Sequence, residues 1–132
     1  MSVRRILLND VDAAGVVFYA RIMAMAHEAY EEAMARAGLA LDELIRAGRI
    51  GLPLVHAEAD FSRPLRHGEQ VETTVALERV GEKSVTVRIA FAVGGAPAAV
   101  VKQVHACVDM DKLASVPVPE DMRAKLARLG DG

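Results

Sequence analysis

The stretch from residue 9 to residue 19 decides how this chain is organised: Asn9-Asp10-Val11-Asp12-Ala13-Ala14-Gly15-Val16-Val17-Phe18-Tyr19. It places two carboxylates and a glycine just ahead of a long amphipathic segment, residues 20–37. The first N–H groups of a helix have no partner within it, and that end of the helix carries roughly half a positive charge. A carboxylate beside such donors suits acyl chemistry, because it attacks a carbonyl carbon or activates water while the N–H groups hold the developing oxyanion. The alternative, which the spacing alone favours, is that Asp10 or Asp12 only caps the helix.

Helical spacing of small and apolar residues predicts one long helix over residues 20–37. Its buried stripe is expected to consist of Ile22, Ala26, Ala29, Tyr30, Ala33 and Ala37. Alanines on this stripe let a helix lie close to a sheet, and the nearby residues Met23, Met25 and Met34 are interpreted as core filler rather than as ligands. Gly38 is expected to end the helix, and a short second helix is predicted over residues 42–47.

Runs rich in β-branched residues, separated by Gly, Pro and polar turns, predict strands over residues 3–8, 54–61, 71–79, 84–93 and 98–110. A short helix is predicted at the end, over residues 120–129. Strands joined as hairpins pair antiparallel, and one apolar helix covers one face of such a sheet. We therefore expect an α+β fold in a single domain, residues 1–132. Because little remains to cover the other face of the sheet, we also expect an oligomer.

The composition is that of an ordinary globular protein, with 52% hydrophobic and 26% charged residues among 132. A net charge of −2 gives no electrostatic case for binding nucleic acid or a membrane. Only 4% of the residues are aromatic, which argues against a stacking platform for single-stranded nucleic acid. Cys107 is the sole cysteine, which fits the reducing cytoplasm. The apolar segment 3–8 is too short for a signal-peptide core or a membrane span.

Residues 10–20, Asp-Val-Asp-Ala-Ala-Gly-Val-Val-Phe-Tyr-Ala, resemble the signature of the 4-hydroxybenzoyl-CoA thioesterase family. That signature is Asp-x-Asp-x-x-Gly, two hydrophobic residues, two aromatic residues and then a helix. Residues 51–65 are similar to the family's second strand, and Lys83-Ser84 with the strands that follow extends the resemblance over most of the chain. The resemblance implies the hot-dog fold, a five-stranded antiparallel sheet wrapped around a long central helix. It also implies a homodimer or homotetramer with active sites at the subunit interfaces.

The same resemblance implies roles for residues of the first motif. Asp12 matches the catalytic aspartate, which acts as nucleophile or general base on a thioester carbonyl. Tyr19 stands where the family polarises that carbonyl with a backbone N–H group. Asp10 is interpreted as structural, holding the loop by hydrogen bonds. Gly15 would let the backbone approach the substrate closely.

Further residues are implied to bind substrate. The run 25–32, which contains His27, and the block 52–56 are similar to the 1,4-dihydroxy-2-naphthoyl-CoA hydrolases. His27 therefore either faces the acyl pocket and meets an aryl hydroxyl, or is a half-buried histidine at the helix edge. Lys83 and Ser84 are implied to contact the phosphates of coenzyme A, and Arg66 on another turn could add to them. For such turn residues, plain solvation is the alternative.

The expected activity is hydrolysis of an aromatic acyl-CoA of the 4-hydroxybenzoyl or 1,4-dihydroxy-2-naphthoyl type. The alternatives are a broad short- or medium-chain acyl-CoA thioesterase, or a non-catalytic acyl-binding hot-dog module, against which an intact Asp12 argues. Neither a metal nor a bound cofactor is expected, since coenzyme A is part of the substrate. His105 and Cys107 lack a third ligand at any standard zinc spacing. There is no phosphate loop and no dinucleotide-binding motif.

Overall fold

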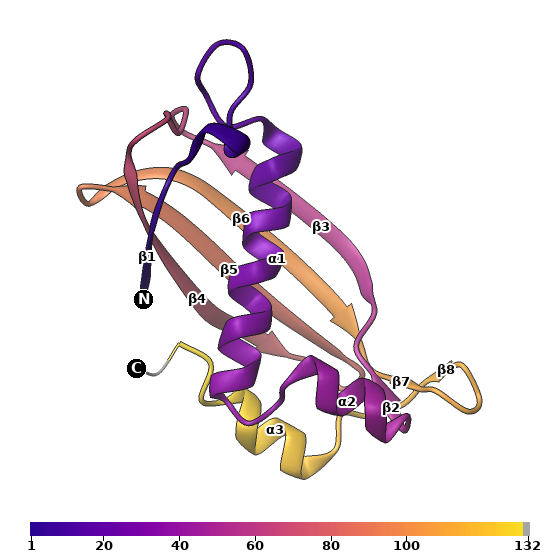
Figure 1. Ribbon diagram of the computed structural model, residues 1–132. Helices are drawn as coiled ribbons and strands as arrows, with labels where there is room; N and C mark the ends of the chain where they lie inside the picture. The colour runs from indigo at the N-terminus through magenta and orange to yellow at the C-terminus, as the bar shows by residue number, and fades with distance from the viewer. Residues whose placement is uncertain (131–132) are drawn as a thin grey trace.

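A computed structural model describes residues 1–130. Its core is a five-stranded antiparallel sheet that curves around one long helix, α1 (Tyr19–Arg36), as Figure 1 shows. The strands of this sheet are β1 (Ser2–Arg5), β3 (Leu54–Phe61), β4 (Gln70–Val80), β5 (Ser84–Val93) and β6 (Ala96–Ala106). The expected α+β architecture is confirmed.

Smaller elements gather at the C-terminal end of α1. They are the helices α2 (Leu41–Ala47) and α3 (Glu120–Leu126) and a small sheet of β2 (Ile50–Gly51), β7 (Val108–Asp109) and β8 (Ala114–Ser115). A 3-10 turn, η1 (Leu8–Asp10), precedes the loop that leads into α1. None of the helices in this described part of the chain is both long and apolar enough to cross a lipid bilayer.

The strand order in the large sheet is β1-β4-β5-β6-β3. β4, β5 and β6 are neighbours joined by tight turns, as the sequence predicts. β3 is different, because the chain passes from β3 to the far side of the sheet before it enters β4. β3 therefore pairs with β6, with Ala57 opposite Gln103 and Ala59 opposite Val101, and its other edge has no strand partner within residues 1–130.

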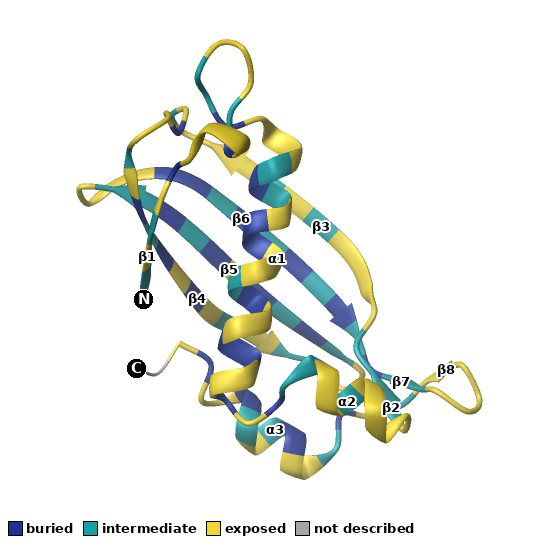
Figure 2. Cartoon of the chain, in the orientation of Figure 1, coloured by how far each residue is buried: buried dark blue, intermediate teal, exposed yellow. Residues whose placement is uncertain are grey.

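The core lies between α1 and the concave face of the sheet (Figure 2). The buried residues of α1 are Ile22, Met25, Ala26, Tyr30, Ala33 and Met34, which confirms the predicted stripe and the packing role of two of the methionines. The sheet contributes the alternating residues Val85, Val87, Ile89 and Phe91. The helix ends as expected at Gly38, whose φ of +88° lets Leu39 N–H donate to Met34 O at 2.8 Å.

Two predicted strands are shorter in the structure. Strand 3–8 stops at Arg5, since the chain then turns into η1, where Leu7 N–H donates to the Asp10 carboxylate. Strand 98–110 is interrupted at Cys107, which is buried and donates its N–H to Lys83 O at 2.8 Å rather than to a neighbouring strand. The last helix ends at Leu126 instead of residue 129.

The outer face of the sheet differs from the uncovered apolar face that underlies the sequence-based expectation of an oligomer. It carries charged groups such as Arg88, and Lys102 pairs with Glu78 at 3.1 Å. One group of exposed apolar residues lies along β3, the edge strand that Figure 2 shows mostly in the colour of exposed residues, and at the start of α1. It consists of Leu54, Val55, Phe61, Phe18 and Tyr19, while other exposed apolar residues lie elsewhere, such as Val3 on β1 and Ile45 on α2.

Candidate active site

The loop between η1 and α1 is a compact hairpin, residues 11–17. Val11 and Val17 form an antiparallel bridge, and Asp12 N–H donates to Val16 O at 3.0 Å. Gly15 N–H donates to Asp12 O at 3.0 Å, which closes a tight turn. Gly15 adopts a φ of +78°, a conformation that side-chain-bearing residues rarely take, and no atom lies within 4 Å of where its Cβ would be. The backbone at Gly15 is therefore open to an approaching molecule.

Asp12 lies exposed at the first position of this tight turn, paired across the hairpin with Val16. Its Oδ1 accepts hydrogen bonds from Ala14 N–H at 2.9 Å and from Val16 N–H at 3.4 Å. Its second carboxylate oxygen, Oδ2, accepts none from residues 1–130. The N-cap of α1 is Phe18, without a side-chain hydrogen bond, so the alternative that Asp10 or Asp12 caps this helix is wrong. Asp12 is oriented by its own loop and keeps one oxygen free for chemistry.

Asp10 is the opposite case, since its side chain is fully buried. It accepts hydrogen bonds from Arg4 Nη2 at 2.6 Å, from Arg21 Nε at 3.0 Å and from Leu7 N–H at 2.8 Å. Burial raises the pKa of Asp10, but these hydrogen bonds together outweigh it and hold the pKa below its ordinary value. The interpretation of Asp10 as structural is confirmed: it ties β1, η1 and the first turn of α1 together.

The start of α1 presents its free N–H groups beside a hollow. Tyr19 is the first helical residue, so its N–H lacks a partner within the helix. A cavity of about 380 Å³ opens there, lined by Val17, Tyr19 and Ile22, by Phe61 at the end of β3, and by Arg63 and Pro64 just after it. The rings of Phe18 and Tyr19 are both exposed, with centroids 4.6 Å apart. The Asp12 loop, an anion-binding helix end and an apolar hollow thus lie together.

Arg66 lies next to this loop. Val16 and Arg66 form an antiparallel bridge, Val17 N–H donates to Leu65 O at 2.8 Å, and His67 N–H donates to Gly15 O at 3.1 Å. The turn that precedes β4 is thereby paired to the Asp12 loop, which brings Arg66 into the candidate site.

Lys83 and Ser84 lie at the other end of the sheet. They follow β4, which starts beside the Asp12 loop and runs away from it (Figure 1). A strand of this length spans about 35 Å at ~3.3 Å per residue. Within one chain, Lys83 and Ser84 are not brought together with Asp12.

His27 is half exposed on the third turn of α1. Its Nε2 lies 3.8 Å from Glu31 Oε1, and its ring lies 5.6 Å from the ring of buried Tyr30. His27 thus lies at the edge of the buried stripe of α1. Neither contact involves the cavity at Tyr19, so the contact with an acyl group stays a prediction.

Comparison with known proteins decides the family. The sequence profile described as the thioesterase-like superfamily matches residues 6–126. This chain belongs to the thioesterase-like superfamily. A 1,4-dihydroxy-2-naphthoyl-CoA hydrolase of Synechococcus elongatus is 33% identical over 121 residues, which cover 91% of this chain and 89% of that protein.

Solved structures agree with this membership. A 1,4-dihydroxy-2-naphthoyl-CoA thioesterase from Synechocystis superposes with a TM-score of 0.83 at 27% identity, covering 99% of this chain and 97% of its own. A gentisyl-coenzyme A thioesterase superposes with a TM-score of 0.82 at 29% identity, covering 92% and 98%. The hot-dog fold implied by the sequence motifs is confirmed, and the family resemblance with it.

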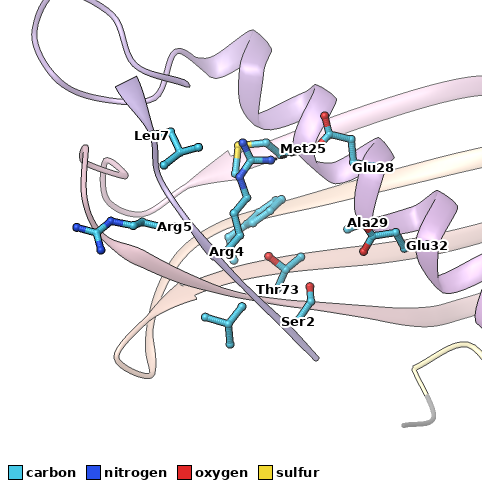
Figure 3. Close-up of a pocket in the computed structure, with 11 residues that line it drawn as sticks. Ser2, Arg4, Arg5, Leu7, Met25, Glu28, Ala29, Glu32 and Thr73 are labelled. Carbon is cyan, nitrogen blue, oxygen red and sulfur yellow. Dashed lines mark hydrogen bonds and ion pairs between the residues drawn. The ribbon is translucent and has the colours of Figure 1, made fainter. Parts of the chain in front are cut away.

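A second cavity, of about 420 Å³, lies on the opposite flank of α1, between that helix and β1 (Figure 3). Arg4 reaches across it toward the helix, where its Nη1 lies 3.0 Å from Glu28 Oε2, whereas Arg5 points away. Its arginine is already engaged with Glu28 and, through Nη2, with Asp10 at the base of the Asp12 loop. The residues that line this cavity include neither Asp12 nor Tyr19.

Sequence reasoning does not single out Arg63 and Glu69, which the structure places behind the Asp12 loop. Arg63 lines the cavity at Tyr19, and its Nη2 lies 2.6 Å from Glu69 Oε2. The two residues lie six apart in an irregular segment, where neither helical nor strand periodicity relates them. The only local signal is a pair of opposite charges flanking the turn 66–68.

His105 and Cys107 do not form a metal site. His105 Nδ1 lies 3.1 Å from Leu52 O, and the Cys107 thiol lies 3.9 Å from Pro117 O. Among residues 1–130, no three His, Cys, Asp or Glu side chains are grouped so as to hold a metal ion.

Proposed function

We propose that this protein hydrolyses the thioester bond of a hydroxylated aromatic acyl-CoA, releasing the free acid and coenzyme A. The observation that carries the proposal is the free Oδ2 of Asp12, held by its loop directly ahead of the unpaired N–H groups of α1. The choice of an aromatic acyl group is supported by relatives named for 1,4-dihydroxy-2-naphthoyl-CoA and gentisyl-CoA. 4-Hydroxybenzoyl-CoA belongs to the same substrate class.

In the proposed reaction, the thioester carbonyl oxygen accepts a hydrogen bond from Tyr19 N–H. Asp12 either attacks the carbonyl carbon or removes a proton from an attacking water molecule. The negative charge that develops on the carbonyl oxygen is stabilised by Tyr19 N–H and by the positive end of α1. The C–S bond then breaks, the thiolate of coenzyme A takes a proton, and one water molecule is consumed overall. Neither a metal nor a further cofactor takes part in this scheme.

We further propose that the working unit is at least a dimer, formed by antiparallel pairing of β3 with β3 of a second copy. The unpaired edge of β3 and the exposed side chains of Leu54, Val55 and Phe61 support this arrangement. A two-fold axis across β3 lays the Phe61 end of one subunit beside the Leu54 end of the other. Two such dimers joined in a homotetramer are the further assembly proposed.

The same two-fold axis gives Lys83 and Ser84 a role that they lack within one chain. They lie at the Leu54 end of the sheet, since Ser84 is paired with Ala106 and Leu54 with His105. In the dimer they approach the Asp12 loop of the other subunit. Lys83 and Ser84 from one subunit, with Arg66 from the other, are therefore proposed to contact the phosphates of coenzyme A.

Hydrolysis of a panel of CoA esters, followed with a thiol reagent, tests the proposal. The panel contains 4-hydroxybenzoyl-, gentisyl- and 1,4-dihydroxy-2-naphthoyl-CoA and alkyl esters of matched size. Highest kcat/KM on the hydroxyaryl esters is the expected result. Equal turnover of the alkyl esters would favour a broad acyl-CoA thioesterase. Binding without turnover would favour an acyl-binding module. A cytoplasmic location is proposed with this function, on the basis of the single cysteine.

A further inference from the structure

The carboxylate of Glu69 joins two segments behind the Asp12 loop. Its Oε2 accepts a hydrogen bond from Arg63 Nη2 at 2.6 Å, and its Oε1 accepts one from Arg66 N–H at 2.6 Å. Both side chains of the ion pair are largely shielded, with 29% of Arg63 and 22% of Glu69 exposed. The hydrogen bond from Arg63 is the main cause that lowers the pKa of Glu69, so the pair is ionised at neutral pH.

This carboxylate is connected to Asp12 by a continuous series of short contacts. Glu69 holds the backbone of Arg66, and Arg66 is bridged to Val16. Val16 N–H in turn donates to Asp12 Oδ1 at 3.4 Å. On either side of this bridge, Leu65 O accepts from Val17 N–H and Gly15 O accepts from His67 N–H. The segment 65–67 is therefore hydrogen-bonded to the Asp12 loop along residues 15–17.

The arginine of the pair is not fully satisfied. Its Nη1 is buried and has no hydrogen-bond partner among residues 1–130. A buried donor without a partner destabilises a fold, so stability alone is a poor explanation for an arginine at this position. Arg63 also lines the cavity at Tyr19, so the pair borders the start of the helix that carries the proposed oxyanion donor.

We propose that Arg63 and Glu69 form a positioning pair, which holds the turn 65–69 against the Asp12 loop and so sets the distance between Asp12 and Tyr19 N–H. The inference rests on the thioesterase function proposed above. Neither residue touches the reacting atoms. The pair acts by fixing the backbone of Arg66, and through it Val16. A small misplacement of a reacting group lowers the rate of the chemical step far more than it weakens substrate binding.

Kinetics of Glu69→Gln provide the first test, with Glu78→Gln as the matched control. Glu78 also loses an ion pair in this substitution, that with Lys102 on the outer face of the sheet. Glu69→Gln is expected to lower kcat about tenfold with KM within about twofold, whereas Glu78→Gln leaves both within about twofold. Arg63→Gln should match Glu69→Gln, and the double variant should lose no more than either single one. The proposal would be overturned if the kcat losses of the two single variants added up in the double variant, or if Glu78→Gln lost as much kcat as Glu69→Gln. A change in KM without a change in kcat would overturn it as well.

Hydrogen–deuterium exchange provides a readout independent of activity. In Glu69→Gln, the segment 11–18 should exchange faster than in the wild type, while the β5 and β6 segments keep their protection. Unchanged exchange in segment 11–18, or a uniform increase across the sheet, would contradict a local positioning role. Absence of hydrolysis by the wild type would refute the proposed function, and the exchange result alone would then decide whether the pair holds the loop. Arg63→Lys, which keeps the charge, covers the case in which Arg63→Gln fails to fold.

Discussion

Asp10 and Asp12 lie two residues apart in the chain but in opposite environments. The Asp10 carboxylate is fully buried between the guanidinium groups of Arg4 and Arg21, whereas Asp12 is exposed and accepts hydrogen bonds from Ala14 and Val16 of its own loop. The buried carboxylate fixes the base of the loop, and the exposed one lies on the loop itself. The two residues therefore serve as controls for each other.

Asp12→Asn should lower the rate of hydrolysis at least about a hundredfold, because it replaces the nucleophile or base with a neutral amide. Its thermal midpoint and its binding of a CoA ester should stay close to those of the wild type. Asp10→Asn should instead destabilise the fold. It should lower the free energy of unfolding by about 1–3 kcal/mol, because two guanidinium groups lose their charged partner. Steady-state kinetics and urea unfolding of both variants separate the roles. A folded Asp12→Asn protein with near-normal turnover would refute the catalytic assignment.

Substitution of Gly15 should report on the shape of the loop. Gly15→Ala forces a side chain into a φ of +78°, at a cost of about 1–2 kcal/mol, and should lower kcat by distorting the turn below Asp12. Gly15→Asn should retain more activity, since asparagine tolerates this conformation better. The ratio of kcat values for the two variants is the measurement. Equal loss in both would indicate that space, rather than backbone conformation, matters at this position.

His27 is expected to contribute to substrate choice. A site that bonds a substrate hydroxyl discriminates against analogues without one, because its own polar group is then left unpaired. His27→Ala should therefore narrow the difference in kcat/KM between hydroxyaryl and alkyl esters more than it lowers the rate on alkyl esters. Glu32→Ala, one turn further along α1 and bordering the cavity beside β1, is a suitable control. If His27→Ala affects both classes alike, the histidine is only a surface residue.

Charge at the β3 edge should disrupt assembly. Phe61 is 50% exposed at the end of β3, and Val3 is 58% exposed on β1, the opposite edge of the sheet. Phe61→Asp should shift the sedimentation coefficient toward that of a monomer and lower activity with it. Val3→Asp should leave the assembly intact. A fully active wild-type monomer at micromolar concentration would contradict the interface proposed here.

Stability should fall in mild acid because of His105. Its ring is buried, stacked on Tyr30 at 4.3 Å, with Nε2 3.0 Å from the side-chain amide of Gln103. Burial is the main cause that lowers the pKa of His105, with nearby His27 adding to it, although the Leu52 carbonyl acts in the opposite direction. The unfolded chain therefore binds a proton that the folded chain excludes, and stability is lost as the pH falls below about 6.5 toward the folded pKa. Urea midpoints at pH 7.5 and 5.5 should differ more for the wild type than for His105→Leu, and an equal difference would exclude His105 as the cause.

Local patterns in the sequence predict the elements well and the topology less well. The spacing of Ile22, Ala26 and Tyr30 and the alternation in β5 follow directly from the periodicity of helix and strand. That β3 crosses to pair with β6 is a long-range property, which no local pattern encodes. The early end of β1 has a similar cause, since Asp10, which accepts from Leu7 N–H, is also bonded to Arg4 and to Arg21, 11 residues further along the chain.

The residues of the candidate site also fall into those that a local motif predicts and those that depend on long-range contacts. Asp12, Gly15 and Tyr19 belong to one short motif, which the structure folds into the hairpin 11–17 and the first residue of α1. Arg66 meets this loop only through backbone pairing across 50 residues of chain, at Val16. The contacts expected of His27, Lys83 and Ser84 depend on a bound substrate or on a second subunit, so they stay predictions.

The separation of Asp12 from Lys83 along the length of β4 has a consequence for mixed populations of chains. In the proposed dimer, each site takes its aspartate from one polypeptide and its lysine from the other. A homodimer of Asp12→Asn and a homodimer of Lys83→Glu would each hold two defective sites. When the two proteins are unfolded together and refolded, the mixed dimer would gather both defects into one site and leave the other whole. An equal mixture of two inactive homodimers would then regain about a quarter of the wild-type activity after refolding, because half of its dimers are mixed and each mixed dimer has one intact site.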